Sequence, residues 1–339
     1  MKKLILQFIL FFTIGCVDAK SPILTQKQLK RHPPRVTRTC CAFGTNLKIA
    51  VFSFIHLNHV IDFTELGEHH YLGHKNEGNG ILYSQKGGFI DLGHVREWAD
   101  WTAFLFLQIQ NNSHDSIFYK KLGNEGGMRH LQLNNVSELD LESKIKLAGK
   151  IAFDLSYWHE IATGYGVSAA PFISEKFSSF SPEDMYSNIL GIEIGMQAIR
   201  SSREYDKAVT NLLNEKLITL QVVKTIEETY AAFDNVESIW WSRDYNMPNN
   251  RITLRRNYFE SNCIVPWLLP NQKPTNSPDE LEVPLCTIND AALSKYYSLV
   301  INANYKIPIH KVLHQHSGRK IKVSQFDNFA NDIKNTLSN

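Results

Sequence analysis

The stretch GGFIDLGHVREWADW (Gly87–Trp101) carries the clearest folding signal in the chain. Its paired glycines predict a turn. Asp91 is a good N-cap for a helix over about 92–110, because its carboxylate can accept N–H groups that the first turn leaves unpaired. The helical period places His94 on the same side of this helix as three apolar residues, Trp98, Trp101 and Leu105. A buried imidazole needs a partner or a task, so His94 is a candidate site residue.

A long helix expected over 138–163 repeats this arrangement. Its opening SELD at 137–140 resembles a capping box, with Asp where Glu is usual. Buried positions step along it by three and four and end on a histidine: Leu141, Ile145, Ala148, Ala152, Leu155 and His159. Glu160 lies about 100° further round the helix. If the two apolar stripes pack together, His94 and His159 approach one another.

These residue types suit two kinds of chemistry. Histidines beside carboxylates can act as general acids and bases, and two imidazoles with a glutamate can bind a divalent metal such as zinc, as in metallohydrolases. His159 and Glu160 begin the zinc signature HExxH, but Thr163 stands at its last position, so a second imidazole must come from another helix. We expect His94, His159 and Glu160 as metal ligands and Glu97 as a further acid, base or orienting carboxylate. The alternative is a hydrogen-bonded polar network in the core.

A third segment supplies polar residues. The run SPED at 181–184 predicts another helix start, with proline at the first helical position. One side of this helix is small and polar: Asp184, Ser187, Asn188, Gly191 and Gly195. A glycine within a helix costs about 1 kcal/mol relative to alanine, so a close helix crossing or a ligand must compensate. We assign substrate binding, or orientation of the histidines and Glu160, to Asp100, Glu175, Asp184 and Asn188.

The N-terminus has the pattern of an export signal. Two lysines precede the uncharged apolar run Leu4–Gly15, whose length of about twelve residues is short of the roughly 20 that a membrane-spanning helix needs. TIGC at 13–16 resembles a lipobox, in which the cysteine becomes lipidated, while VDA at 17–19 offers a competing cleavage site. We expect residues 1–16 to be a signal peptide and Cys16 to anchor the protein to a bacterial membrane. A soluble secreted protein is the alternative.

Beyond the signal peptide, composition predicts one domain. Residues 17–39 are polar and contain prolines, which favours a tether, and residues 40–339 contain no repeat that would divide them. Helical patterns predominate, including later ones over about 219–233, 288–300 and 323–337, while strands are expected over 49–55 and 81–85. The expected fold class is mainly α (α+β), with packed helices and a small β-sheet. The net charge of +2 excludes a global field that would attract nucleic acid.

The remaining cysteines agree with export, because an even number in an oxidising compartment predicts disulfides. They are Cys40, Cys41, Cys263 and Cys286. Cys263 and Cys286 enclose a proline-rich loop and are the expected pair, worth about 3 kcal/mol by loop entropy. Alternatively, Cys40 and Cys41 join the N-terminal segment to that region. A nucleophilic thiol is less favoured, because no clear helix start follows either residue to lower its pKa.

Five motifs in this order resemble a single bacterial family. They are CCAFG at 40–44, GGFIDLGHVREWADWTAFL at 87–105, EGGMRHL at 125–131, WHEIATGYG at 158–166 and SEKFSSFSPEDMYSNILGI at 174–192. The family consists of exported, often lipidated proteins catalogued only as a domain of unknown function (DUF4056). The resemblance implies an envelope location and a single domain, and it brings no activity, cofactor or catalytic residue.

Together these observations predict a lipid-anchored envelope protein with a His/Glu site built from two helices. The expected activity is hydrolysis of a lipid, peptide or cell-wall bond, with or without a metal. The alternative is a non-catalytic lipoprotein that binds an envelope partner or a small ligand. The sequence does not indicate the substrate.

Overall fold

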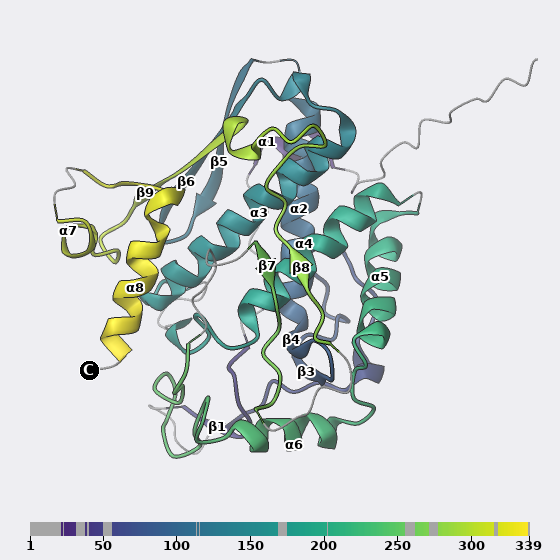
Figure 1. Cartoon of the computed structure of the whole chain (residues 1–339), viewed down its shortest axis with the longest axis vertical. Coiled ribbons are helices and arrows are strands. Elements are labelled where there is room, and N and C mark those ends of the chain that lie inside the picture. Colours follow the sequence, from purple (N-terminus) through teal and green to yellow (C-terminus); the bar gives the residue numbers. More distant parts are fainter. Residues whose placement is uncertain are drawn as a thin grey trace, which may run out of the picture.

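The fold is known from a computed structural model (Figure 1). It describes residues 22, 24–31, 38, 41–49, 56–112, 114, 116–168, 175–201, 203–254, 262–270, 277–314 and 318–337. The expected signal peptide with Cys16, the residue Cys40 and most of the strand expected over 49–55 lie outside these residues.

Three helices form the centre of the molecule: α2 (Leu92–Asn111), α3 (Leu141–Gly164) and α4 (Asp184–Arg200) (Figure 1). α5 (Tyr205–Thr219) packs against α4, and α8 (Phe326–Leu337) packs against α3. The main hydrophobic core lies between these helices. The expected fold class, mainly α with small β-sheets, is confirmed.

The crossing of α2 and α4 is unusually close, and the glycines of α4 explain it. A Cβ atom added at Gly191 would lie 2.2 Å from the backbone oxygen of Val95, and one added at Gly195 would lie 2.8 Å from the oxygen of Ala99. Of the two explanations for glycines inside this helix, the helix crossing is therefore the one the structure supports.

α3 begins later than its sequence predicts. Its N-cap is Asp140, whose Oδ1 accepts the N–H of Ser143 at 2.8 Å. The residues before it form the 3₁₀ turn η2 (Val136–Glu138). Leu141 is 41% exposed, so the buried stripe that leads to the histidine begins at Ile145 instead.

The largest sheet is antiparallel and four-stranded, in the order β10 (Lys320–Lys322), β9 (Tyr297–Ala303), β6 (Gly127–Asn134) and β5 (Ile117–Asn124). The helix expected over 288–300 is wrong. That segment contains the 3₁₀ turn η4 (Leu293–Lys295) and the start of β9. Burial alternates along β9, which is the pattern of a strand with one face on the core.

Short elements complete the described fold. A hairpin of β3 (Ile81–Ser84) and β4 (Gly88–Asp91) confirms the expected strand over 81–85 and delivers Asp91 directly to the start of α2. The others are β1 (Leu47–Lys48) with β2 (His56–Leu57), β7 (Cys263–Ile264) with β8 (Leu281–Glu282), α6 (Ile226–Val236), α7 (Ile309–Val312), η1 (Phe63–Glu65), η3 (Glu175–Phe177) and η5 (Val323–Gln325).

Part of the segment expected as a tether packs on the fold. In α1 (Gln26–Lys30), the carbonyl of Leu29 accepts hydrogen bonds from Gln108 of α2 at 3.1 Å and from Lys120 of β5 at 2.5 Å. Arg38 is also buried. The chain therefore contacts the central helices and the sheet before residue 40.

The described structure contains no disulfide between Cys263 and Cys286, so the expected pair is not confirmed. Cys263 pairs with Glu282 across β7 and β8. With Cys40 outside the described residues, the alternative pairing stays a prediction.

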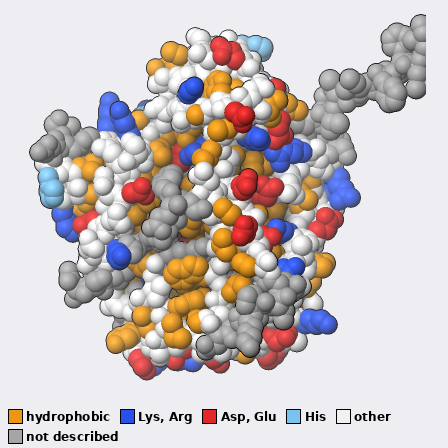
Figure 2. Space-filling view, in the orientation of Figure 1, with side chains coloured by type: hydrophobic (Ala, Val, Ile, Leu, Met, Phe, Trp, Pro, Cys, Tyr) orange, Lys and Arg blue, Asp and Glu red, His pale blue; other side chains and the backbone are white. Residues whose placement is uncertain are grey.

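The surface has mixed charge. Figure 2 shows acidic and basic side chains interspersed over the face drawn, as expected from a net charge of +2. Among the described residues, no helix has the length and apolar character required to cross a membrane.

Candidate metal centre

The three expected ligands converge at the centre of the helical core. His94 lies in the first turn of α2, and His159 and Glu160 lie near the end of α3. One ligand atom from each lies within 4.8 Å of the other two, and all three residues are buried. The centroids of the two imidazole rings are 5.8 Å apart. No other group of three such residues is found in the described part of the chain.

A carboxylate from outside the helices orients His159. Its Nδ1 donates to Oε1 of Glu125 at 2.8 Å, and Glu125 also accepts from Arg129 at 2.7 Å. A hydrogen bond from Nδ1 to a carboxylate fixes the tautomer, so Nε2 is the ring nitrogen that can bind a metal. Sequence reasoning did not select Glu125, although the EGGMRHL motif contains both it and Arg129.

The glycines of that motif explain how Glu125 reaches the site. Gly126 has φ +63°, and a Cβ atom there would approach the side chains of Ala162 and Trp158 to 3.1 and 3.2 Å. The Nε1 of Trp158 donates to the carbonyl of Glu125 at 2.7 Å. Because Gly126 lacks a side chain, the turn between β5 and β6 can lie against α3.

Two aspartates surround the other imidazole. Nδ1 of His94 lies 3.3 Å from Oδ2 of Asp91 and 3.3 Å from Oδ1 of Asp184. Asp91 also caps α2 through the N–H groups of Gly93 and His94, and it accepts from the backbone N–H of Cys41 at 3.3 Å. Burial alone would raise the pKa of Asp91, but its interactions with His94 and Cys41 lower it. The helix cap and the histidine's partner are thus one residue.

The carboxylate of Glu160 is held by the chain that leads into α4. Its Oε2 accepts from the backbone N–H of Phe180 at 2.8 Å, and its Oε1 accepts from Nδ2 of Asn188 at 3.3 Å. Burial, and then the negative charge of Asp184, raise its pKa to about 8, against the opposing effect of the two histidines. A bound cation would reverse this effect, because it favours the ionised carboxylate.

The acidic surroundings extend beyond the predicted residues. Glu183 is buried, and neither of its carboxylate oxygens has a hydrogen-bond partner among the described residues. Burial and the charge of Asp184 raise its pKa. The guanidinium of Arg251 donates to the carbonyls of Ser179 and Lys176, and burial lowers its pKa to about 10. Sequence reasoning selected neither Glu183 nor Arg251.

Cys41 lies beside this cluster but lacks the character of a nucleophile. It is buried, and burial, followed by the charge of Asp91, raises the pKa of its thiol. The reactive form of cysteine is the thiolate. The described structure therefore gives no support to a cysteine hydrolase that uses Cys41.

Three predicted residues are not members of the ligand group. Glu97 is half-buried on α2, and no hydrogen bond or ion pair among the described residues joins it to His94 or His159. Glu175 lies partly exposed on η3. Asp100 follows His94 by six residues, or about 240° around the helix, which places it on a different face of α2. Asp184, by contrast, lies 3.3 Å from Nδ1 of His94, and Asn188 donates to Glu160.

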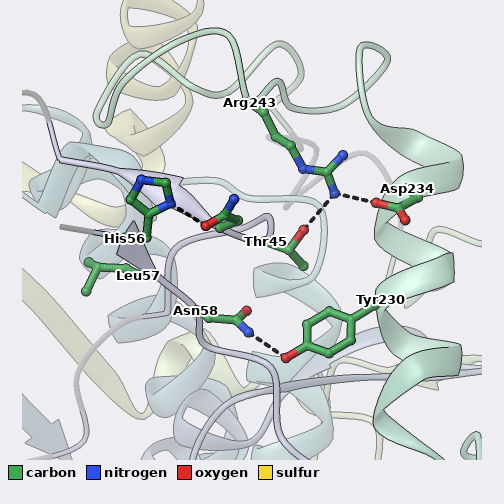
Figure 3. Close-up of a pocket in the computed structure, with 8 residues that line it drawn as sticks. Thr45, His56, Leu57, Asn58, Tyr230, Asp234 and Arg243 are labelled. Carbon is green, nitrogen blue, oxygen red and sulfur yellow. Dashed lines mark hydrogen bonds and ion pairs between the residues drawn. The ribbon is translucent and has the colours of Figure 1, made fainter. Parts of the chain in front are cut away.

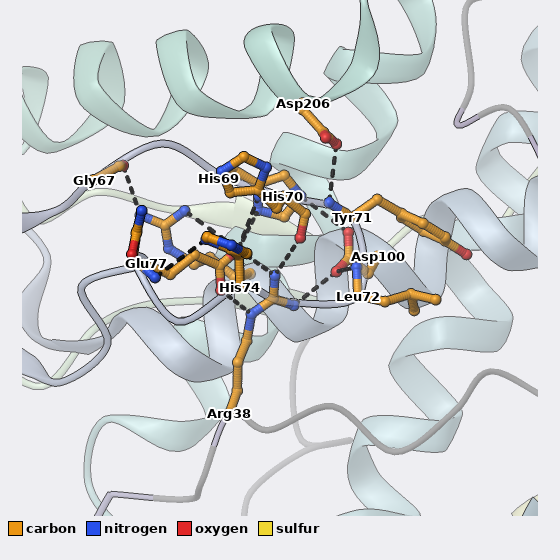
Figure 4. A network of polar contacts seen from close by, with 12 residues as sticks. Arg38, Gly67, His69, His70, Tyr71, Leu72, His74, Glu77, Asp100 and Asp206 are labelled. Carbon is orange, nitrogen blue, oxygen red and sulfur yellow. Dashed lines mark hydrogen bonds and ion pairs between the residues drawn. The ribbon is translucent and has the colours of Figure 1, made fainter.

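Asp100 belongs instead to a second buried network, drawn in Figure 4. Its Oδ2 accepts from Nη1 of Arg38 at 2.7 Å, and its Oδ1 lies 3.0 Å from Nε2 of His69. Arg38 also donates to both oxygens of Glu77, at 2.8 and 2.7 Å. These contacts join the N-terminal segment and the loop around residues 66–78 to the side of α2 away from His94.

The ligand group has the composition of a catalytic zinc site. Zinc is usually tetrahedral, and in catalytic sites three protein ligands leave the fourth position to a water molecule. Two imidazoles and one glutamate provide such a set, and Glu125 provides the carboxylate that typically orients a ligating histidine. The side chains of His159 and Glu125 are 11% and 12% exposed. Among the described residues of the site, solvent therefore reaches this edge.

The fold and this site define a mainly helical α+β protein with a buried centre of two histidines and one glutamate. Residues 28–270 match the family model described as Protein of unknown function (DUF4056). This match covers more than half of the chain, and the protein belongs to that family. No curated protein and no solved structure matches the chain.

Proposed function

We propose that the protein is a metal-dependent hydrolase in which His94, His159 and Glu160 bind one zinc ion. The observation that carries this proposal is the approach of their ligand atoms to within 4.8 Å of one another, from two helices, in the core. The surplus of buried carboxylates around them supports it, because unpaired buried negative charge is costly and a divalent cation relieves that cost.

Each surrounding residue has a distinct task in this proposal. When bound, zinc lowers the pKa of its water ligand and polarises a carbonyl or phosphoryl oxygen. Glu125 holds His159 in one tautomer, and Asp91 and Asp184 orient His94 through its Nδ1. Glu183 is the buried carboxyl group with no hydrogen-bond partner among the described residues, and we assign it the donation of a proton during the reaction, because its raised pKa favours the protonated form.

Metal analysis tests the proposal. Purified protein dialysed against micromolar zinc should retain about one zinc ion per chain. His159→Ala and Glu160→Gln should reduce the retained zinc to the background of a metal-free sample. Glu97→Gln is the matched control, because Glu97 lies one turn from His94 on the same helix but outside the ligand group. Failure of the wild-type protein to retain zinc, nickel, cobalt or manganese would refute the metal site.

Activity is tested on the same variants. The bonds considered are the ester, amide and glycosidic bonds of envelope lipids, peptides and cell-wall polymers. Hydrolysis of one of these substrates should disappear with a chelator and return with zinc, and His159→Ala should remain inactive. If zinc binds and no member of the set is hydrolysed, the metal has a structural task in a binding protein.

A binding protein without catalysis is the second candidate. It is favoured by the hydrogen bonds that both oxygens of Glu160 and Nδ1 of His159 make within the described protein. In that case the polar groups stabilise the core, and removal of one partner costs about 1–3 kcal/mol. His159→Ala would then lower the melting temperature equally with and without zinc.

We also propose that the protein is exported and anchored to a membrane of the bacterial envelope through lipidated Cys16. The support is the order of residues in the first sixteen positions, a positive start, an apolar run and a lipobox-like end. Metabolic labelling with a palmitate analogue tests it. Wild-type protein should be labelled and partition into detergent, whereas Cys16→Ser should be unlabelled. An unlabelled wild-type protein in the soluble fraction would support the secreted form instead.

A further inference from the structure

A second site lies apart from the metal centre and shares no residue with it. A pocket of about 310 Å³ lies between β2, α6 and the loops on either side, and Figure 3 draws the residues that line it. Its lining residues are Thr45, Asn46, His56, Leu57, Asn58, Tyr230, Asp234 and Arg243. The volume is at the lower end of the roughly 300–1,000 Å³ typical of small-molecule sites.

Contacts among the lining residues hold their polar groups in place. Nδ2 of Asn58 donates to the hydroxyl of Tyr230 at 2.5 Å. Nη2 of Arg243 donates to Oγ1 of Thr45 at 2.9 Å and to Asp234. A ligand would therefore meet these side chains largely pre-arranged, which reduces the entropy lost on binding.

Arg243 retains hydrogen-bonding capacity beyond its contacts with Thr45 and Asp234. Its guanidinium lies over the ring of Trp241, with 4.9 Å between its carbon and the ring centroid. Its side-chain hydrogen bonds to described residues all use Nη2. Nε and Nη1 can therefore donate to a ligand, because a guanidinium has five N–H donors in a fixed plane.

Charge and polarity restrict the kind of ligand. Arg243 and Asp234 neutralise one another, and the other polar groups are hydroxyls, amides and an imidazole. An anion would meet the carboxylate of Asp234, and a cation would meet the guanidinium. A neutral ligand with many hydroxyl groups meets neither repulsion and can both donate to and accept from this set. Tyr230 and Leu57 add the apolar surface against which the C–H face of a sugar ring can pack.

We propose that this pocket is a binding site for a neutral saccharide of one or two sugar units. This inference does not depend on the metal centre. The pocket should bind sugar whether or not zinc is bound at the metal centre. The proposal also requires that Arg243 and Asp234 remain paired with each other.

Saturation-transfer NMR on the full chain tests the proposal. The probes are N,N′-diacetylchitobiose and maltose as neutral sugars, with glucose 1-phosphate as the anionic comparison. Wild-type protein should transfer saturation to at least one neutral sugar, equally with and without a chelator. Tyr230→Ala and Arg243→Gln should each reduce the transfer at least fivefold.

Two further variants separate binding from folding. Asn58→Ala removes an exposed amide that contacts Tyr230, so it should weaken transfer while the melting temperature stays unchanged. Tyr305→Ala is the control, because Tyr305 is 86% exposed and outside the pocket. Absence of transfer to both neutral sugars, equal transfer in all variants, or transfer to the phosphate alone would each overturn the proposal.

Discussion

At the scale of single residues, Glu125 has the strongest control over the proposed metal ligands. Its Oε1 accepts from Nδ1 of His159 at 2.8 Å, and its other oxygen accepts from Arg129 at 2.7 Å. Groups that orient a ligating histidine typically affect metal affinity 10- to 100-fold. We expect Glu125→Gln to weaken zinc binding by about that factor, measured by competition with a chromogenic chelator. Glu97→Gln should leave the affinity unchanged, and an unchanged affinity in Glu125→Gln would show that the contact is incidental.

Cys41 provides a second prediction at this scale. Burial and Asp91 raise the pKa of its thiol, whereas Cys286 is exposed. Since alkylation requires an accessible thiolate, iodoacetamide at pH 8 should label Cys286 at least tenfold faster than Cys41. Peptide mass spectrometry in a Cys40→Ser background measures both rates. Comparable labelling of the two thiols in folded protein would revive the cysteine nucleophile.

Residue-level prediction succeeded where one helix carried the whole pattern. The spacing of three and four residues along α3 leads to His159, and Asp91 marks the start of α2, so the convergence of the two histidines followed from local periodicity. Glu125 was missed because it lies on a turn between strands, and its contact depends on how the sheet packs on α3. Asp100 was misplaced because its helix has several buried faces.

At the scale of elements, the crossing of α2 and α4 determines where Asp184 and Asn188 lie. A methyl group at Gly191 would overlap the backbone oxygen of Val95, which cannot move without displacing α2. Overpacking usually costs about 1–3 kcal/mol. We expect Gly191→Ala to lower the free energy of unfolding by at least that amount and to weaken zinc binding. Gln197→Ala, on the exposed side of α4, is the control. If Gly191→Ala is as stable as the wild-type protein and binds zinc equally well, the close helix crossing is contradicted.

The ion pair between Arg38 and Asp100 predicts that the stability of the protein depends on pH. Burial would raise the pKa of Asp100, but His69 and Arg38 lower it. A carboxyl whose pKa is lower in the folded state stabilises the protein above its unfolded value of 3.8, and this stabilisation is lost as the pH falls through the folded value. The free energy of unfolding of the wild-type protein, measured with urea, should therefore fall below about pH 4.

Asp100→Asn tests this assignment. It leaves the Arg38 guanidinium with one carboxylate fewer, which should cost about 3–5 kcal/mol at pH 7, and it should flatten the fall in stability between pH 5 and 3. Asp244→Asn changes an exposed residue outside every ion pair among the described residues and serves as the control. An equally steep fall in Asp100→Asn would assign the acid sensitivity to other carboxylates.

Helices were predictable because their hydrophobic residues recur with a helical period within one continuous segment of sequence. The large sheet was not, because β6 pairs with β9 through contacts such as Leu131 with Leu299, far apart in the sequence. The segment over 288–300 was assigned to a helix on an apparent helical pattern, whereas its later half alternates between buried and exposed positions. Pairing between distant strands decides that structure, and no local pattern reports it.

At the scale of the whole molecule, the proposed zinc ion would join α2 to α3. The same ligands contact the turn before β6 and the chain leading into α4. A ligand that binds only the folded state stabilises it by about 4 kcal/mol at a thousand times its Kd. For a chain of this size, that corresponds to a rise in melting temperature on the order of 5–10 °C. Calorimetry should show this rise when zinc is added to chelator-treated protein.

The control for this last prediction is His159→Ala, which removes one ligand and should melt at the same temperature with and without zinc. Magnesium provides a second control, because it prefers oxygen ligands in octahedral geometry and should stabilise the wild-type protein far less than zinc. If zinc shifts the wild-type protein and His159→Ala by the same amount, the ion binds elsewhere. The convergence of His94, His159 and Glu160 would then be a buried polar network that stabilises the helix packing without binding metal.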